Sequence, residues 1–178
     1  MTEITEPSRL TIRHAEVADG ARIWQLVTDC EVLDTNSCYA YLLLCRDFSS
    51  TTLVAEDEGA IQAFVTAYLP PNRQDTIFVW QIGASASVRR RGLGKSLLRA
   101  LLQGDACRDV QYLEATITPS NTASLRLFRS LAEELGVEFR TLSGFGSGDF
   151  DPRQECSTQH EPEDLVRIGP LRSIDANV

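Results

Sequence analysis

The sequence predicts an α/β protein with a central mixed sheet flanked by helices. Segments of strand-like and helix-like pattern follow one another in the order β, α, α, β, β, β, α, β, α, β, β, which favours this class. The chain has 178 residues, 43% of them apolar, enough for one domain with a buried core. Between residues 77 and 103, an apolar strand, a basic glycine turn and an amphipathic helix follow directly on one another.

The first part of the chain is expected to contain one short strand and two helices. The strand is predicted over Leu10–Arg13, and Asp19 and Gly20 introduce the first helix. Its apolar residues recur at the spacing of one helical face: Ile23, Leu26, Val27 and Cys30. Ser37 is a suitable N-cap for the second helix. The residues that share the apolar face of that helix are Cys38, Tyr41, Leu42 and Cys45, with Tyr39 on a different side.

A β-hairpin and the central strand are predicted next. Residues 53–56 and 61–69 have strand character and are separated by a turn that contains Gly59. Two prolines end this hairpin. The apolar run Ile77–Ile82 then predicts the central strand, and a Leu-rich pattern predicts a helix over Leu93–Gln103.

The last part of the chain is expected to hold three more strands and one helix. The strands are predicted at Tyr112–Ile117, Phe139–Leu142 and Leu165–Ile168. One helical face is marked by Leu125, Phe128, Leu131, Ala132 and Leu135. The glycine- and serine-rich stretch 143–148 is expected to be a flexible loop. We expect a single domain over residues 10–168, with flexible termini at 1–9 and 169–178.

Charge and cysteine content argue against several classes of function. The net charge is −8, so nucleic acid is not an expected partner. No apolar run has membrane-spanning length and no leader pattern opens the chain, so we expect a cytoplasmic protein without a membrane partner. The five cysteines show no Cys-x-x-Cys spacing, so neither a metal site nor a disulfide framework is expected.

The turn between the central strand and its helix has the features of an anion site. Gly92 and Gly94 let the backbone approach a ligand closely, and the unpaired amides at the start of a helix favour phosphate. Four cationic side chains flank these glycines: Arg89, Arg90, Arg91 and Lys95. A glycine turn with a solvated basic face is the alternative interpretation. The turn does not match a P-loop, whose first glycine would fall at Arg89, or a dinucleotide fingerprint, whose third glycine would fall at Leu97.

The pattern Arg-x-x-Gly-x-Gly of residues 89–94 resembles the acetyl-CoA pyrophosphate loop of the GNAT superfamily of N-acetyltransferases. Residues 121–128 resemble the segment of that family in which an Asn and a helix flank the cofactor. Three further segments give a narrower resemblance to the L-2,4-diaminobutyrate acetyltransferases of ectoine biosynthesis. They are residues 34–48, the Trp-Gln-Ile-Gly of residues 80–83, and the His-Glu-x-Glu-x-Leu that begins at residue 160.

The resemblance implies an enzyme that moves acetyl from acetyl-CoA to the 4-amino group of L-2,4-diaminobutyrate and forms a homodimer. The residues implied for cofactor binding are Ile82, Gly83, Ala84, Arg89, Arg90, Arg91, Gly92, Leu93, Gly94, Lys95, Asn121 and Phe128. Those implied for the substrate pocket are Asp34, Tyr39, Trp80, Glu161 and Glu163. Asp75 is added because a diamine needs carboxylate partners, and Arg73 or backbone N–H groups would hold the substrate's own carboxylate.

Acetyl transfer also requires a base, because an alkyl ammonium with a pKa of about 10 is mostly charged at neutral pH. Many family members carry a carboxylate on the central strand, but residues 76–84 contain none. The candidate bases are therefore, in falling order, Glu161, Asp34 and His160. Backbone amides around residues 82–84 are expected to stabilise the oxyanion.

One further departure from the family concerns the leaving thiolate. The Tyr that many relatives place seven residues after the Asn is Phe128 here, so the thiolate would leave unassisted or through water, and Phe128 would pack against the cofactor. Two alternatives stay open. One is a GNAT acetyltransferase acting on another small diamine, a polyamine or a peptide amine, and the other is a non-catalytic acyl-CoA sensor.

Overall fold

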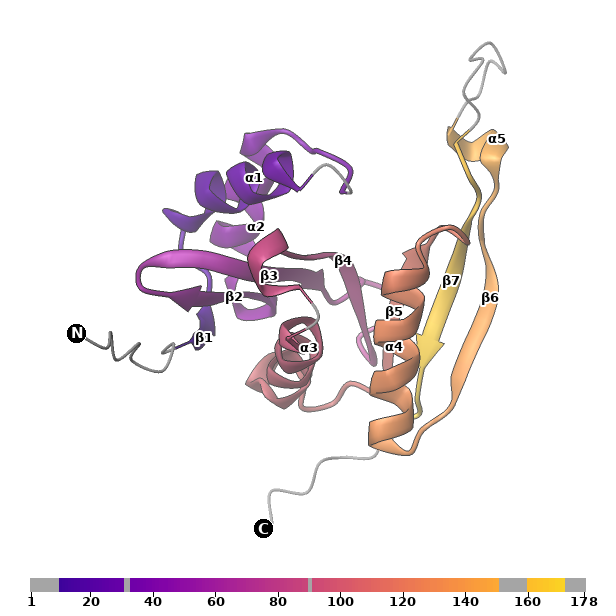
Figure 1. Ribbon diagram of the computed structural model, residues 1–178. Helices are drawn as coiled ribbons and strands as arrows, with labels where there is room; N and C mark the ends of the chain where they lie inside the picture. Colours follow the sequence, from indigo (N-terminus) through magenta and orange to yellow (C-terminus); the bar gives the residue numbers. More distant parts are fainter. Residues whose placement is uncertain (1–9, 31–32, 90, 151–159, 172–178) are drawn as a thin grey trace, which may run out of the picture. The chain divides into compact units, whose positions relative to one another are not determined.

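The computed structural model describes residues 10–30, 33–89, 91–150 and 160–171 (Figure 1). Within these ranges the elements follow the predicted order, with one short helix added after β6. The strands are β1 (Thr11–His14), β2 (Thr52–Asp57), β3 (Ala60–Tyr68), β4 (Thr76–Ala84), β5 (Tyr112–Ile117), β6 (Phe139–Phe145) and β7 (Glu163–Ile168). The helices are α1 (Asp19–Asp29), α2 (Cys38–Asp47), α3 (Leu93–Gln103), α4 (Thr122–Leu135) and α5 (Ser147–Phe150). Short 3-10 turns lie at η1 (Ser49–Thr51), η2 (Ala86–Val88) and η3 (Asp105–Cys107).

The strands form the expected mixed sheet. Their order is β1-β2-β3-β4-β5-β7-β6, with β4 and β5 parallel and the pairs β1/β2, β2/β3, β5/β7 and β6/β7 antiparallel. The chain divides into two compact units, one of residues 1–66 and 81–105 and the other of residues 67–80 and 106–178. The expected tails at 1–9 and 172–178 lie outside the described residues.

In the first unit, helices cover both faces of the antiparallel strands. Successive side chains of a strand point to opposite faces of the sheet. Residues 53–55 of β2 are nevertheless all buried, so both faces of this strand are covered. Val54 and Phe64 belong to a core with the apolar residues of α1 and α2, whereas α3 also packs against β2. Figure 1 shows α1 and α3 on opposite sides of these strands. The hairpin turn contains Gly59 at φ +78°, as the sequence predicts.

A buried carboxylate ties β1, β2 and α1 together. Asp19 accepts hydrogen bonds from Arg13 at 2.6 Å and from Arg22 at 2.8 Å, and Arg13 also pairs with Glu56 of β2. Burial by itself raises the pKa of Asp19, but the hydrogen bonds from Arg13 and from the Glu16 amide, together with the arginine charges, bring that pKa below its usual value. The N-terminal end of α1 is therefore fixed to the sheet by an ionised group.

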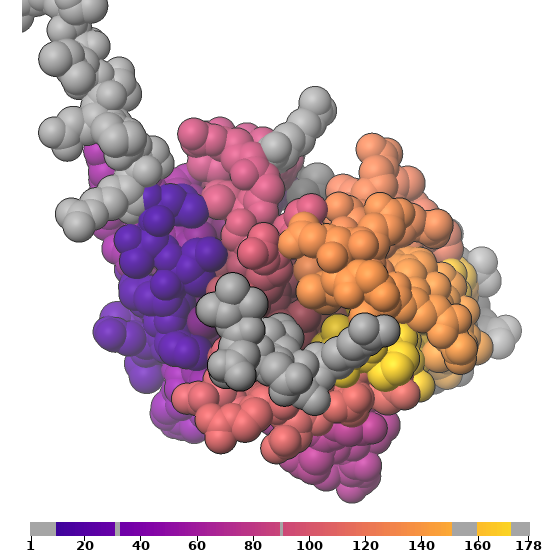
Figure 2. All heavy atoms as spheres, turned by 90° about the horizontal axis from the view of Figure 1, so that it is seen from below, coloured from indigo at the N-terminus to yellow at the C-terminus, as the bar shows by residue number. Residues whose placement is uncertain are grey.

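In the second unit, α4 packs against β6 and β7, and Figure 2 shows the orange atoms of α4 beside the yellow atoms of β7. Parallel pairing of β4 with β5 covers residues 76–78 against residues 112–114. The described part of the expected C-terminal tail is bound here, because Leu171 is buried and its N–H donates to the Gln111 carbonyl at 2.7 Å.

A second buried carboxylate crosses β5. Glu114 is 0% exposed and accepts hydrogen bonds from Arg73 at 2.5 Å and from Nε of Arg167 at 2.7 Å. Arg167 also lies over the ring of Tyr112, 4.9 Å from its centroid. Each oxygen of this carboxylate has a cationic donor, as a buried charge requires.

The prediction of a flexible loop over residues 143–148 is wrong. Strand β6 continues to Phe145, and residues 147–150 form α5. The glycine and serine content of this stretch suggests flexibility, but an ideal Cβ at Gly144 would lie 2.1 Å from the Glu163 carbonyl of β7. The glycine therefore allows close pairing between β6 and β7 rather than a loop.

Candidate functional site

The predicted phosphate turn, residues 89–95, follows β4 and the 3-10 turn η2 and runs into the first turn of α3. Gly92 is the N-cap of α3 and has the left-handed φ of +80°. A bond at the start of the helix runs from the Ser96 amide to the Gly92 carbonyl at 3.0 Å. The amides of Leu93 and Gly94 precede it in the first turn, where an α-helix offers no acceptor of its own. The first turn contains no acidic residue, and glycine has no side chain that could cap it. This is the geometry that backbone binding of phosphate requires.

The surroundings of this turn fit an anionic ligand. Arg89 and Arg91 are exposed and Lys95 is half-buried, whereas Arg90 lies outside the described residues. An ideal Cβ built on Gly92 would meet no atom within 4 Å, so open space adjoins the helix start. The cationic groups and the helix N-terminus together give this turn a positive potential.

Cys30, the C-cap of α1, links the phosphate turn to the end of β4. Its thiol donates to the Ala84 carbonyl at 3.4 Å, and its own carbonyl accepts from Arg89 at 3.4 Å. The main chain of α1 therefore positions one of the arginines expected to hold the pyrophosphate.

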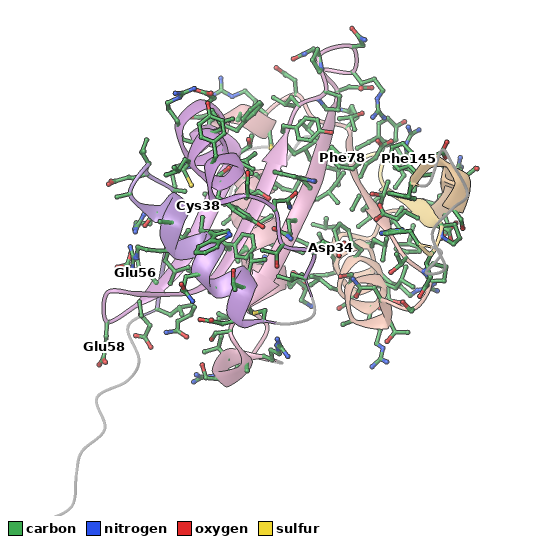
Figure 3. The ribbon with its side chains drawn as sticks, turned by 90° about the horizontal axis from the view of Figure 1, so that it is seen from above. Asp34, Cys38, Glu56, Glu58, Phe78 and Phe145 are labelled. Carbon is green, nitrogen blue, oxygen red and sulfur yellow. The ribbon has the colours of Figure 1, made fainter. Side chains whose placement is uncertain are left out.

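The segment before α2 lies directly against β4. An ideal Cβ at Gly83 would fall 2.6 Å from Cδ1 of Leu33 and 2.9 Å from Cε1 of Phe64, so a side chain at residue 83 would force these two side chains to move. The Asp34 carbonyl accepts a hydrogen bond from Nε2 of Gln81 at 2.9 Å. Ser37 caps α2 by accepting from the Ala40 amide at 3.3 Å, as predicted. Figure 3 shows Asp34 in the loop that leads to Cys38 on α2.

The two tyrosines of α2 have different surroundings. Tyr39 is 66% exposed, as the helical pattern predicts for a residue off the buried face. Tyr41 is fully buried against Phe64, and its hydroxyl donates to Oε1 of Gln81 at 2.8 Å. In this unit the structure brings Asp34 close to the residues expected to bind pantetheine, Ile82, Gly83 and Ala84.

In the second unit, Glu161 lies next to the start of α4. Its Oε2 accepts from the Ser120 amide at 3.2 Å. The following residue, Asn121, caps α4 by accepting from the Ser124 amide at 3.1 Å through Oδ1. A candidate base and a candidate cofactor contact therefore meet at the junction between β5 and α4.

The second candidate base in this unit has a defined tautomer. Nδ1 of His160 lies 2.7 Å from the Glu161 carbonyl, and because a carbonyl can only accept, Nδ1 must carry the proton. The lone pair of the neutral imidazole is then on Nε2. The ring stacks on Phe150 with centroids 4.0 Å apart. Glu163 is half-buried at the start of β7.

Three further residues named from the sequence have structural partners or positions that bear on their roles. A tryptophan can bind a substrate only if part of its ring is accessible. Trp80 is 40% exposed and so has such a surface. Asp75 lies directly before β4. Its main-chain carbonyl accepts hydrogen bonds from the amides of Gln111 and Tyr112 at the start of β5. Arg73 is paired with the buried Glu114, which explains its position without a substrate.

Phe128 lies in the interior rather than at a surface. Its side chain is 1% exposed on α4, so it offers a cofactor almost no area for contact. The absence of a hydroxyl at this position is consistent with a packing role. Among the described residues, no group of three or more His, Cys, Asp or Glu is arranged to hold a metal ion.

Comparison with known proteins identifies the family of this fold. The family model described as acetyltransferase (GNAT) family matches residues 20–132, which include the turn and the start of α4. The chain belongs to the GNAT acetyltransferase family. Within the described residues, no helix is long and apolar enough to span a membrane.

Curated GNAT relatives share more than the family pattern. An L-2,4-diaminobutyric acid acetyltransferase of Shouchella clausii is 46% identical over 164 residues, which is 92% of this chain and 89% of that protein. One of Marinococcus halophilus with the same name is 47% identical over 87% of each chain.

Among solved structures, the diaminobutyrate acetyltransferase EctA of Paenibacillus lautus, in complex with L-2,4-diaminobutyric acid and coenzyme A, is 39% identical. Its TM-score is 0.87, with 93% of this chain and 98% of that chain covered. The NatC complex bound to Gag peptide and CoA has a TM-score of 0.70 at 14% identity, covering 92% of this chain and 99% of that chain, and so shares the fold alone.

The sequence did not single out every residue that organises the site. Gln81 and Cys30 have the contacts described above, but the sequence indicates Gln81 only as part of a family pattern and Cys30 only as a residue on the apolar face of the first helix. A signal for Gln81 was available, because it is an amide within an otherwise apolar run of a central strand. A polar side chain at such a position needs a partner in the fold.

Proposed function

We propose that this GNAT acetyltransferase transfers acetyl from acetyl-CoA to the 4-amino group of L-2,4-diaminobutyrate, giving the N4-acetyl product of ectoine biosynthesis. The observation that carries this proposal is the likeness to the P. lautus structure that holds both diaminobutyric acid and coenzyme A. The start of α3, where the left-handed N-cap Gly92 has no side chain to cap the helix, gives an independent physical reason for a ligand that carries phosphate, as CoA does.

Each part of the reaction has candidate groups. The amides of residues 93–95 and the neighbouring arginines would bind the pyrophosphate, and the backbone of Ile82–Ala84 would bind the pantetheine arm. Asp34, Tyr39, Trp80 and Glu163 would contact the diamine. Binding both partners in fixed geometry would supply much of the rate enhancement.

The geometry favours His160 as the group that accepts the proton. Its Nδ1 is occupied by the Glu161 carbonyl, which leaves the basic Nε2 for an ammonium or a bridging water. Glu161 instead uses an oxygen to hold the Ser120 amide. We therefore reverse the order of these two bases derived from the sequence, and we assign Asp34 to binding the second amine.

Two variants that keep the hydrogen bonds of these side chains test this assignment. His160→Asn keeps a donor at the position of Nδ1 and removes the base, so kcat should fall by about 10²–10⁴-fold with little change in the KM for acetyl-CoA. Glu161→Gln keeps an acceptor for the Ser120 amide, and its effect should be smaller. A larger loss of kcat in Glu161→Gln would return the role to the carboxylate.

A product assay separates the candidate activities. The purified protein is given acetyl-CoA with L-2,4-diaminobutyrate, spermidine or a peptide, and free thiol release is followed together with mass spectrometry of the product. Release dependent on diaminobutyrate supports the proposal. Release only with another amine favours a different GNAT substrate, and binding of acetyl-CoA without release in any case favours a sensor.

We also propose that two copies associate through β6. Among the described strands, β6 is the last of the sheet, and residues 140–145 are exposed. Its exposed apolar side chains, with one from α5, are Leu142, Phe145 and Phe150. Light scattering should give twice the mass of one chain for the wild type and one chain mass for Leu142→Lys/Phe145→Lys.

We place the reaction in the cytoplasm. The support comes from the cysteines, because Cys30, Cys38, Cys45 and Cys107 are all free thiols, as is usual in a reducing compartment. Fractionation of a producing cell, with the activity measured in each fraction, checks this assignment.

A further inference from the structure

We infer that Gln81 is a positioning residue that holds the substrate-binding segment before α2, and that its partner in this role is the buried hydroxyl of Tyr41. The inference deepens the proposed function, on which its statement about the diamine rests. Its structural part depends only on the contacts within the first unit.

The carboxamide of Gln81 joins two groups that belong to different parts of the N-terminal fold. Nε2 donates to the Asp34 carbonyl at 2.9 Å, and Oε1 accepts from the Tyr41 hydroxyl at 2.8 Å. The orientation of the amide is fixed by chemistry, because the Asp34 carbonyl can only accept and so must face the NH2 group. The Tyr41 hydroxyl then has only the oxygen of Gln81 to face, and it acts as the donor.

Tyr41 and Gln81 are both held in place by other contacts. Tyr41 is completely buried and packs edge-to-face with Phe64, 6.5 Å between centroids. The main chain of Gln81 is held as well, because its carbonyl accepts from Oγ1 of Thr66 at 3.2 Å. Gln81 therefore presents a fixed donor to the Asp34 carbonyl from a rigid strand.

Among the described residues, the segment that Gln81 holds has two other fixed points. Leu33 rests over Gly83, and Ser37 caps α2, but between them the backbone of residues 34–36 is irregular. The Asp34 carbonyl lies on the same residue as the carboxylate assigned to the diamine. If the link is broken, the carboxylate loses its fixed position while the pyrophosphate turn, which has other supports, keeps its own.

Two variants break the link at different points, and a third is a matched control. Gln81→Glu keeps an acceptor for Tyr41 but places a carboxylate opposite the Asp34 carbonyl. Tyr41→Phe removes only the hydroxyl and keeps the ring against Phe64. In the control Gln74→Glu, an exposed amide that donates to the Pro70 and Pro71 carbonyls is lost in the same way, far along the chain from Asp34.

Two measurements are made on each variant. The first is hydrogen exchange of the Ala40 amide, which donates to both the carbonyl and the hydroxyl of Ser37 and so reports whether the turn that opens α2 is kept. The second is the pair of KM values for diaminobutyrate and acetyl-CoA. Gln81→Glu should raise exchange at Ala40 and the KM for diaminobutyrate by about tenfold, the ratio expected for loss of one hydrogen bond with repulsion in its place. The KM for acetyl-CoA should change less than about twofold, and Tyr41→Phe should show a smaller shift in the same direction.

The inference is overturned if exchange at Ala40 in Gln81→Glu equals that of the control. It is also overturned if exchange rises but both KM values rise together, because that pattern indicates a general loss of structure. Exchange is measured without substrate, so it decides whether Gln81 holds the segment even in a protein that fails to acetylate diaminobutyrate. That failure would instead reject the proposed function.

Discussion

Replacing Gly92 with alanine should greatly weaken CoA binding at a small cost in stability. Gly92 has φ +80°, and an ideal Cβ there would meet no atom within 4 Å. The fold therefore loses only the free energy of a left-handed backbone carrying a side chain, about 1–2 kcal/mol. For a chain of this size, that cost lowers Tm by about 2–8 °C.

The cost in binding should be larger. A methyl group at residue 92 would stand in the open space beside the first turn of α3, where the pyrophosphate is proposed to lie. Displacing the phosphate from one charge-assisted hydrogen bond costs about 2–3 kcal/mol, which corresponds to a Kd raised about 30- to 150-fold.

Gly59 provides a matched control for the backbone term. It has φ +78°, and an ideal Cβ there also meets no atom within 4 Å, but it lies in the turn between β2 and β3. Gly59→Ala should lower Tm by about the same amount as Gly92→Ala, while its Kd for CoA in titration calorimetry should equal the wild-type value. Equal Kd values for the two variants would refute the assignment of the α3 start as the phosphate site.

Three more predictions follow from buried ionisable groups. The folded pKa of Asp19 is depressed below 3.8, so its contribution to stability is present above about pH 4 and is lost as the pH falls through the folded pKa; Tm of the wild type should drop over that range and Tm of Asp19→Asn should drop less. Burial raises the pKa values of Cys45 and Cys107 to about 11, with the charge of Asp19 adding to the effect at Cys45, so iodoacetamide at pH 8 should label these thiols in urea but not in the native protein. Glu114→Gln leaves two arginines without their full charge partner and should lower the free energy of unfolding by about 3 kcal/mol in urea denaturation, whereas the Kd for CoA of the remaining folded protein should not change.

Much of the fold could be predicted because periodic patterns decide it. The bounds of α3 and β5 agree with the structure, since each has a regular apolar pattern and a clear stop at glycine or proline. The error at residues 143–148 has the opposite cause. Gly144 serves close strand pairing there, and composition alone does not distinguish a glycine needed for contact from one in a loop.

The parts of the site that could be predicted are those whose residues are neighbours in the sequence. The phosphate turn depends on neighbours in sequence, so the pattern of residues 89–95 was enough to propose it. The tautomer of His160 and the double hydrogen bond of Gln81 depend on carbonyl groups that a sequence does not place. Arg73 shows the same limit, since its buried partner on β5 was not visible from its own segment.

The two outer strands of the sheet differ in a way that limits how the protein can assemble. Strand β1 has four residues and carries Arg13, which is committed to ion pairs, whereas β6 has seven residues and exposed Leu142 and Phe145. A short, charged edge strand resists pairing with a further strand, whereas a long, apolar edge strand allows it. If two copies pair through β6 as proposed, twofold symmetry uses this edge in both of them. The described strands then offer no second apolar edge, so growth would stop at a pair and fibres would be avoided.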